Sequence, residues 1–386
     1  MTDAARPVLV LNAGSSSLKY QLVVPETGEK QAGGTVERIG EPGSGVADHA
    51  GALARMADDL RADGVDLAAA RLRAVGHRVV HGGADFSEPV VIDDAVLDRV
   101  RELSALAPLH NPAAVTCIEA AREHFDVPHV AVFDTAFFAS LPPEASTYAL
   151  PRDLAERHSI RRYGFHGTSH RWVSRAAADL LDRPVGELRQ VILHLGNGCS
   201  ASAVRGGVAV ETSMGLTPLQ GLVMGTRSGD VDPGLHAYLG REAGLSLEEI
   251  DTLLNKRSGV LGLSGVNDFR ELEDRLAAGD PDARLAFDVV VHRLKHYVGA
   301  YLAILGGVDV LVFTAGIGEN SIALRAAVTD GLEGLGIAVD RARNGARSNQ
   351  ARVISPDASP VVVAVVPTNE ELAIARQTAE LVGQGV

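Results

Sequence analysis

One strand–turn–strand pattern occurs twice in this sequence, and it constrains the fold more than any other feature. The first copy, VLVLNAGSSSLKYQLV over residues 8–23, has an apolar strand, a turn of small and hydroxyl residues, and a second strand of alternating polarity. The second copy, QVILHLGNGCSASAV over residues 190–204, repeats that order around another glycine turn. Each copy lies near the start of one half of the chain, so the pattern predicts an internally duplicated α/β fold.

The first turn carries the groups that commonly bind a phosphate. Gly14 permits a backbone conformation that other residues resist. The hydroxyls of Ser15 and Ser17, the ammonium of Lys19 and the free backbone N–H groups of the turn could then face one anion. A solvated serine-rich hairpin is the alternative that this segment alone leaves open.

Length and charge narrow the class of protein. A chain of 386 residues is too long for one ordinary core, which predicts two domains. The formal net charge of −13 argues against nucleic acid and anionic membranes as partners, so an anionic substrate would need local cationic groups. The two cysteines form no CxxC motif, and we see neither a signal peptide nor an apolar run long enough to span a bilayer. We therefore expect a soluble cytoplasmic protein.

Several polar groups follow apolar strands directly. The strand predicted over residues 127–133 is followed by Asp134, and the strand over 361–366 is followed closely by Glu370. A third strand, 308–314, precedes the turn Gly316–Gly318 and a helix. In open α/β sheets, ligands bind at the carboxyl ends of the strands. We expect these groups to face a nucleotide, although Asp134 could instead cap a helix or turn.

The segment AVGHRVVH, residues 74–81, reads as a further strand. Because alternate residues of a strand share a face, Arg78 and Val80 point one way while His77 and His81 point the other. The two histidines have a spacing that suits zinc on a helix, but the β-rich sequence argues against that use.

Two longer motifs place polar groups beside flexible backbone. In YGFHGTSH, His166 precedes a helix that we expect to be capped by Thr168 or Ser169. In MGTRSGD, Arg227 lies between small residues that let a ligand approach. The alternatives are that His170 only packs within its helix and that Arg227 forms a surface salt bridge. Cationic groups near glycine turns suit phosphoryl transfer, in which charge stabilisation and Mg²⁺ carry the catalysis.

The motifs NAGSSSLKY, GHRVVHGG, FDTAF, YGFHGTSH, HLGNG, MGTRSGDVDP, AGIGENS and TNEE, in this order, resemble those of the acetate kinase family over nearly the whole chain. The resemblance implies an α/β fold of two duplicated actin/Hsc70-like (ribonuclease H-like) domains with an active-site cleft between them. It implies an N-terminal domain of residues 1–150 plus 368–386, on the carboxylate and magnesium side, and a nucleotide-binding, dimerising domain of residues 151–367. The implied reaction is reversible, direct in-line transfer of the ATP γ-phosphoryl to acetate, giving acetyl phosphate and ADP, with Mg²⁺ or Mn²⁺, in a homodimer.

The resemblance also assigns roles to single residues. Asn12 and Glu370 match magnesium-associated positions, and Lys19 matches an ATP-binding position. Arg78 matches the arginine that binds the substrate carboxylate, and Asp134 the active-site acid. His166 and Arg227 match the groups that stabilise the transferring phosphoryl. The pocket for the substrate methyl group matches Val80, Leu109, Phe165 and Pro218. The nucleotide-binding segments match His194, Leu195, Gly196, Asn197, Gly198, Asp268, Phe269, Arg270, Gly316, Ile317, Gly318, Glu319 and Asn320.

Acetate needs no general base, because a carboxylic acid with a pKa of roughly 4.3 is already ionised at neutral pH. We therefore predict that Asp134 orients an arginine or a metal-bound water. A propionate kinase on the same scaffold is the nearest rival, since one methylene discriminates by only about 1–3 kcal/mol. A non-enzymatic actin-like or Hsc70-like ATP-binding protein is a remote one, because it would not need the carboxylate-binding Arg78.

Overall fold

The computed structural model describes residues 6–14, 16–67, 70–108 and 110–383, and it divides into two compact units. Unit 1 comprises Met1–Ala139, Gly167–Ser169 and Asn369–Val386, and unit 2 comprises Ser140–His166 and His170–Thr368. The domain bounds expected from the sequence, 1–150 with 368–386 and 151–367, stay a prediction. Ser15 and Leu109, both predicted site residues, lie outside the described residues.

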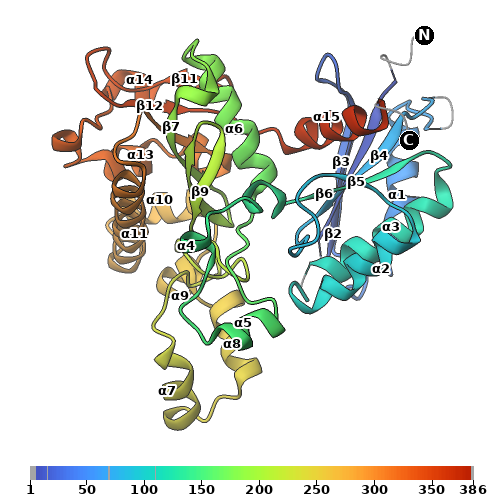
Figure 1. Ribbon diagram of the computed structural model, residues 1–386, viewed down its shortest axis with the longest axis horizontal. Helices are drawn as coiled ribbons and strands as arrows, with labels where there is room; N and C mark the ends of the chain where they lie inside the picture. The colour runs from blue at the N-terminus through green and yellow to red at the C-terminus, as the bar shows by residue number, and fades with distance from the viewer. Residues whose placement is uncertain (1–5, 15, 68–69, 109, 384–386) are drawn as a thin grey trace. The chain divides into compact units, whose positions relative to one another are not determined.

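Unit 1 is built on a sheet with the strand order β3-β2-β1-β4-β6-β5. β1, β4 and β6 are parallel, whereas β1–β2, β2–β3 and β5–β6 are antiparallel pairs. The strands are β1 (Val8–Ala13), β2 (Ser17–Val24), β3 (Glu29–Glu37), β4 (Ala74–Val79), β5 (Val90–Val91) and β6 (His129–Phe133). The helices are α1 (His49–Ala62), α2 (Asp94–Glu102), α3 (Asn111–His124) and α15 (Glu370–Gly383), with 3₁₀ turns at Leu103–Ala105 and Ala136–Phe138 (Figure 1).

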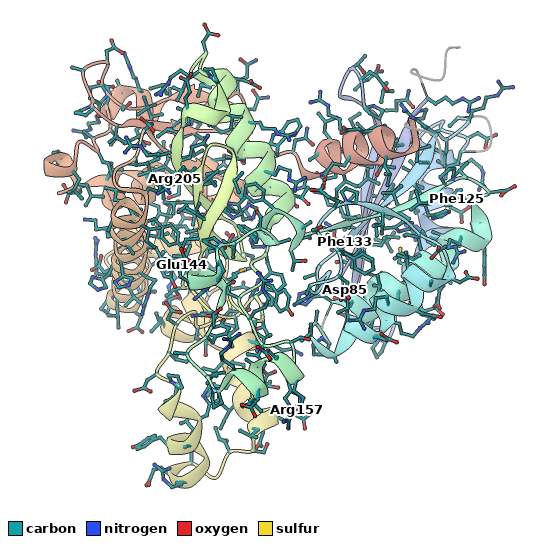
Figure 2. The ribbon with its side chains drawn as sticks, viewed as in Figure 1. Asp85, Phe125, Phe133, Glu144, Arg157 and Arg205 are labelled. Carbon is teal, nitrogen blue, oxygen red and sulfur yellow. The ribbon has the colours of Figure 1, made fainter. Side chains whose placement is uncertain are left out.

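The two faces of this sheet have different partners. Leu9 and Leu11 belong to a core shared with α1 and α3, while the ring of Phe133 stacks on Phe86 with centroids 4.5 Å apart (Figure 2). The other face packs on α15, where a Cβ added to Gly76 would lie only 2.5 Å from Thr378 Oγ1. The glycine therefore lets the helix approach the sheet closely. Because side chains alternate along a strand, residues two positions apart share a face. Asn12 therefore lies on the same face as Val10, and Arg78 on the same face as Gly76, which is the face that packs on α15.

Unit 2 repeats the topology, with the strand order β9-β8-β7-β10-β12-β11 and the same pattern of parallel and antiparallel pairs. This confirms the predicted duplicated fold. The strands are β7 (Arg189–Leu195), β8 (Cys199–Arg205), β9 (Val208–Thr212), β10 (Val310–Thr314), β11 (Arg352–Val353) and β12 (Val362–Val365). The helices are α4 (Pro143–Ser146), α5 (Arg152–Arg157), α6 (Gly167–Leu180, whose first three residues belong to unit 1), α7 (Gly234–Glu242), α8 (Leu247–Lys256), α9 (Gly259–Ser264), α10 (Phe269–Ala277), α11 (Pro281–Leu305), α12 (Ala315–Asn320), α13 (Ile322–Thr329) and α14 (Arg341–Gly345), with 3₁₀ turns at Val185–Glu187 and Glu333–Leu335.

Helix α3 begins with Asn111 and Pro112, a pair typical of a helix cap and first turn, but a buried hydrogen bond gives Asn111 another role. The cap of α3 is His110 rather than Asn111. The Asn111 amide instead bridges the backbone of His81, accepting from its N–H at 3.1 Å and donating to its C=O at 3.0 Å. Tertiary contacts thus use a side chain that local propensity assigns to the helix end. None of the helices within the described ranges has the length and apolarity to cross a membrane.

Candidate active site

In unit 1, Arg78 and Asp134 form an enclosed ion pair at the ends of β4 and β6. Arg78 Nε donates to both carboxylate oxygens of Asp134 at 3.1 Å, and Nη2 donates to Oδ2 at 2.5 Å. The Asp134 side chain is only 2% exposed and that of Arg78 18%. Burial alone disfavours the charge on Arg78, but the carboxylates of Asp134 and Glu370 outweigh it and raise the pKa of the guanidinium. The contact is the one that an orienting role for Asp134 requires.

Other predicted residues gather around this pair. Arg78 Nη1 donates to Asn12 Oδ1 at 3.3 Å. Lys19, directly opposite Asn12 on β2, forms an ion pair with Glu371 in the first turn of α15. We call this set the unit 1 cluster: Asn12, Lys19, Arg78, Asp134, Glu370 and Glu371.

Two further predicted residues flank the unit 1 cluster. Ser17 begins β2, and its carbonyl accepts from Gly14 N–H at 2.7 Å, which closes the first turn. Val80 follows the last residue of β4 and is half-buried.

The unit 1 cluster offers the oxygen ligands that Mg²⁺ prefers. The Asn12 amide oxygen and the Glu370 carboxylate are of this kind. In nucleotide enzymes Mg²⁺ usually takes one or two protein carboxylates, with substrate phosphates and waters completing its coordination. The donors therefore fit a nucleotide-bound Mg²⁺, although the described residues contain no group of three or more His, Cys, Asp or Glu residues that could hold a metal ion.

In unit 2, His166 and Arg227 meet above Gly198. A Cβ built on Gly198 would lie 2.5 Å from Arg227 Nη2 and 3.4 Å from His166 Nε2, so only glycine leaves room for both groups. Arg227 is half-buried, and its Nη1 donates to the carbonyl of Pro218 at 2.6 Å. Burial lowers the pKa of Arg227, and no carboxylate among the described residues offsets it. A guanidinium in such surroundings is suited to an anionic ligand.

His166 is held in an uncommon backbone conformation at the start of α6. It is the N-cap of that helix in place of the predicted Thr168 or Ser169, with a left-handed φ of 60°. Non-glycine residues adopt this conformation at a cost that often coincides with functional sites. The ring stacks on His194, with centroids 4.2 Å apart, and its Nδ1 lies 2.9 Å from Ser200 Oγ. His170 is fully buried and contacts two serine hydroxyls, so it does more than pack.

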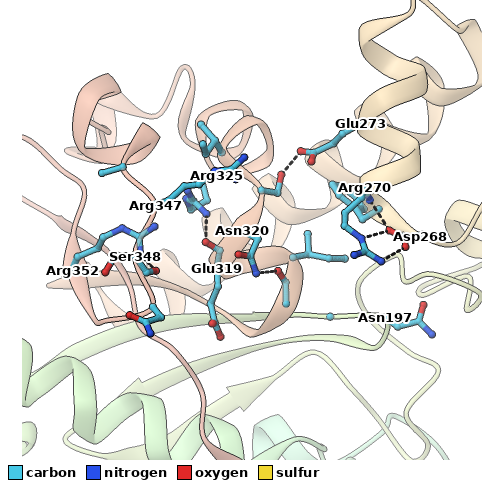
Figure 3. A pocket seen from close by; sticks show the side chains of 18 of the residues that line it. Asn197, Asp268, Arg270, Glu273, Glu319, Asn320, Arg325, Arg347, Ser348 and Arg352 are labelled. Carbon is cyan, nitrogen blue, oxygen red and sulfur yellow. Dashed lines mark hydrogen bonds and ion pairs between the residues drawn. The ribbon is translucent and has the colours of Figure 1, made fainter. Parts of the chain in front are cut away.

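Unit 2 also contains a cavity of about 1130 Å³ (Figure 3). Predicted nucleotide-binding residues from three separate segments form part of its wall: Gly196, Asn197, Asp268, Phe269, Arg270, Gly316, Ile317, Glu319 and Asn320. Four others do not line it: His194, Leu195, Gly198 and Gly318. The turn predicted before the helix is also wrong, because α12 begins at Ala315 and includes Gly316–Gly318.

Two charged side chains of the cavity are paired with each other. Arg270 Nη2 donates to Asp268 Oδ2 at 2.5 Å, and these hydrogen bonds lower the pKa of Asp268 to about 2 (Figure 3). Burial raises the pKa of Glu319, which also lines the cavity.

Sequence reasoning missed the basic segment between α14 and β11. Arg347, Ser348, Asn349 and Arg352 line the cavity, together with Arg325 and Glu273 (Figure 3). Arg352 Nη1 donates to the carbonyl of Ser348 at 3.1 Å, and burial lowers the pKa of Arg352. The segment has neither a glycine turn nor an apolar strand in front of it. Its one signal is the presence of two arginines in a short polar stretch.

Known proteins resemble this chain over nearly its whole length. The model of the acetokinase family matches residues 7–376. The chain is 55% identical to an acetate kinase of Leifsonia xyli subsp. xyli, over 98% of this chain and 99% of that protein. The crystal structure of Porphyromonas gingivalis acetate kinase has a TM-score of 0.92 at 43% identity, covering 98% and 100% of the two chains. A propionate kinase from Francisella tularensis subsp. tularensis has a TM-score of 0.90 at 40% identity, covering 96% and 98%. With a family match over nearly its whole length and relatives this similar, the chain belongs to the acetokinase family.

Proposed function

We propose that this chain is an acetate kinase, which reversibly transfers the γ-phosphoryl group of ATP to acetate and gives acetyl phosphate and ADP. The observation that carries the proposal is the meeting of His166 and Arg227 above Gly198, with no carboxylate of the described residues paired to the arginine. Two donors fixed in this way suit the charge that spreads over a phosphoryl group in transfer. Acetate is proposed as the acceptor of the phosphoryl group because the similar proteins are acetate kinases.

Arg78 would bind the acetate carboxylate, because its guanidinium is charged and its orientation is fixed by Asp134. Acetate is already ionised at neutral pH and attacks without a general base. Asp134 therefore keeps Arg78 in position and takes no proton. Val80, Phe165 and Pro218 would contact the methyl group.

Asn12 and Glu370 would hold Mg²⁺, which neutralises the polyphosphate charge when bound. The nucleotide itself would bind in the cavity of unit 2, whose 1130 Å³ exceeds the usual range of about 300–1,000 Å³ for small-molecule sites. Lys19 would add positive charge near the phosphates if it leaves Glu371. His166 and Arg227 would contact the moving phosphoryl group.

The test is a hydroxamate assay for acyl phosphate, run with acetate, propionate and butyrate side by side. We expect acetate to give the highest kcat/KM. The similarity to a propionate kinase supports the alternative substrate, and discrimination by one methylene is worth only about 1–3 kcal/mol. A higher kcat/KM for propionate would make the chain a propionate kinase. Failure to form acyl phosphate with any of the acids would overturn the proposal and favour a non-enzymatic ATP-binding protein.

We also place the enzyme in the cytoplasm as a homodimer. Cys117 and Cys199 are free and buried, which suits a reducing compartment. Tyr238 on α7 and Leu247 on α8 are 56% and 76% exposed, and large exposed apolar side chains often mark an interface. Light scattering coupled to size-exclusion chromatography distinguishes a dimer from a monomer of 40.4 kDa.

A further inference from the structure

Four side chains of unit 2, Ser202, His170, Ser200 and His166, form a continuous hydrogen-bonded line. Ser202 Oγ lies 2.7 Å from His170 Nδ1, and His170 Nε2 lies 2.8 Å from Ser200 Oγ. Ser200 Oγ lies 2.9 Å from His166 Nδ1. Both serines and His170 are buried, with Ser200, Ser202 and His170 at 0% exposure, so water does not compete for these contacts.

The number of hydrogen atoms limits how this line can be arranged. A serine hydroxyl has one hydrogen to donate, yet Ser200 Oγ contacts two imidazole nitrogens. It can donate to one of them and must accept an N–H from the other. In the first arrangement Ser200 donates to His166 Nδ1 and accepts from His170 Nε2. In the second, Ser200 donates to His170 Nε2 and accepts from His166 Nδ1.

His170 can serve both arrangements because burial and the neighbouring His194 hold its pKa well below the ordinary value. A neutral imidazole carries one N–H, on either nitrogen. When that hydrogen is on Nε2, Nδ1 accepts from the Ser202 hydroxyl. When it is on Nδ1, it is donated to Ser202. The four groups can therefore reverse together.

We propose that Ser200 is a positioning residue that keeps a hydrogen on His166 Nε2, the ring nitrogen that lies beside Gly198 together with Arg227 Nη2. The proposal rests on the proposed function, in which Nε2 faces the phosphoryl group. In the first arrangement the neutral ring of His166 has its hydrogen on Nε2, since Nδ1 is an acceptor. In the second arrangement the cationic ring has hydrogens on both nitrogens. In these two pairings Nε2 carries a hydrogen in either protonation state. The pairing that the proposal excludes is a neutral ring that donates from Nδ1, because its bare Nε2 lone pair would face the anion.

The charged and titratable groups around His166 favour a ring that donates a hydrogen bond from Nε2 while it is neutral. His194 of β7 stacks on the ring, His170 lies behind Ser200, and Arg227 approaches the same point above Gly198. The arginine cation disfavours a second positive charge beside it. A ring that donates while neutral avoids this repulsion.

The kinetic test compares three variants in the hydroxamate assay. Ser200→Ala removes the shared hydroxyl, and Ser200→Thr keeps it. Ser174→Ala is the matched control, because Ser174 is a buried serine of α6 whose hydroxyl has no hydrogen-bond partner in the described part of the chain. We expect Ser200→Ala to lower kcat about tenfold at neutral pH, with little change in the KM for acetate and ATP. Its kcat should fall further as pH rises and the His166 ring loses its charge, because the neutral ring of the variant is no longer held with its hydrogen on Nε2. Ser200→Thr should restore a flatter profile, and Ser174→Ala should match the wild type.

A second measurement is independent of activity. Two-bond ¹H–¹⁵N correlation spectra of histidine-labelled wild-type protein report which ring nitrogen carries the hydrogen, with His166→Gln identifying the signal. We expect the neutral ring of His166 to have its hydrogen on Nε2. A hydrogen on Nδ1 would overturn the proposal, as would a Ser200→Ala variant with the kcat and pH profile of the wild type. Absence of acyl phosphate in the wild type would instead remove the proposed function and leave the tautomer result to stand.

Discussion

Replacing Asp134 by asparagine separates an orienting carboxylate from a catalytic base. The change preserves shape but replaces one oxygen by an NH₂ group that faces the donors of Arg78. One of the two short contacts, at 2.5 and 3.1 Å, is then lost, and the other loses its charge. Hydrogen bonds to charged groups contribute about 1.5–3 kcal/mol each. Since the Asp134 side chain is 2% exposed, solvent screening does not reduce this value. We expect the free energy of unfolding to fall by about 2–3 kcal/mol.

The same loss applies to binding through Arg78, and it corresponds to a decrease of about 30- to 150-fold in kcat/KM for acetate. Most of it should appear as a higher KM for acetate. Urea unfolding and the hydroxamate assay measure the two effects. Asp85→Asn is the control, because it removes an exposed ion pair with Arg99 in the same unit (Figure 2) and should change stability by less than about 1 kcal/mol. A kcat reduced about 10⁴-fold, the upper range for general acid–base catalysis, with unchanged Mg²⁺ dependence, would refute the orienting role.

Three further outcomes are expected. Arg227→Gln should lower kcat far more than it raises the KM for ATP, because in the proposed function the arginine stabilises the charge of the transition state. Steady-state kinetics measure both constants, and an effect on KM alone would contradict the assigned role. Gly198→Ala should lower kcat at least about tenfold by displacing Arg227, whose Nη2 would lie 2.5 Å from the new Cβ. Gly299→Ala should leave kcat unchanged, because a Cβ there would meet no other described residue within 4 Å beyond the backbone of its own helix and its chain neighbours. Equal activities of the two variants would contradict the crowding at Gly198. Burial and His129 hold the pKa of His77 well below its ordinary value. Below pH 6.5 the unfolded chain therefore binds a proton at this group that the folded chain does not bind. The free energy of unfolding should then fall by about 1.4 kcal/mol for each unit of decrease in pH. Urea unfolding between about pH 7 and pH 5 should show a shallower decline for His77→Gln, and parallel declines would exclude His77 as the cause.

The sequence was most informative where chemistry and periodicity coincide. Strand alternation predicted the face of its strand on which Arg78 lies, and the position of Asp134 after a strand predicted that it lies at a sheet end. The structure joins the two side chains in one ion pair. The repeated hairpins predicted the duplicated sheets. Such signals are local, so a single sequence contains them.

What the sequence did not reveal depends on contacts between distant segments. Asparagine is a residue type that often caps helices, but the side-chain amide of Asn111 is hydrogen-bonded to the backbone of His81. The link between His170 and Ser200 joins α6 to β8, and nothing in either segment indicates the other. Arg347 and Arg352 approach the cavity only because the chain after α14 returns to it. Pairings of this kind follow from tertiary folding, which local patterns do not encode.

The pairing of α15 with the first sheet has a consequence for how the protein is made. All of unit 2 is synthesised after the strands of unit 1 and before this helix. Until unit 2 has been translated, the nascent chain on the ribosome therefore has a first sheet without α15. The face of the sheet that contains Val10 and Gly76 stays exposed during that time. Glu370 and Glu371 also reach the Arg78 region at that late stage. Prematurely terminated products would be open to aggregation and proteolysis, and they would lack Glu370 and Glu371 beside Arg78.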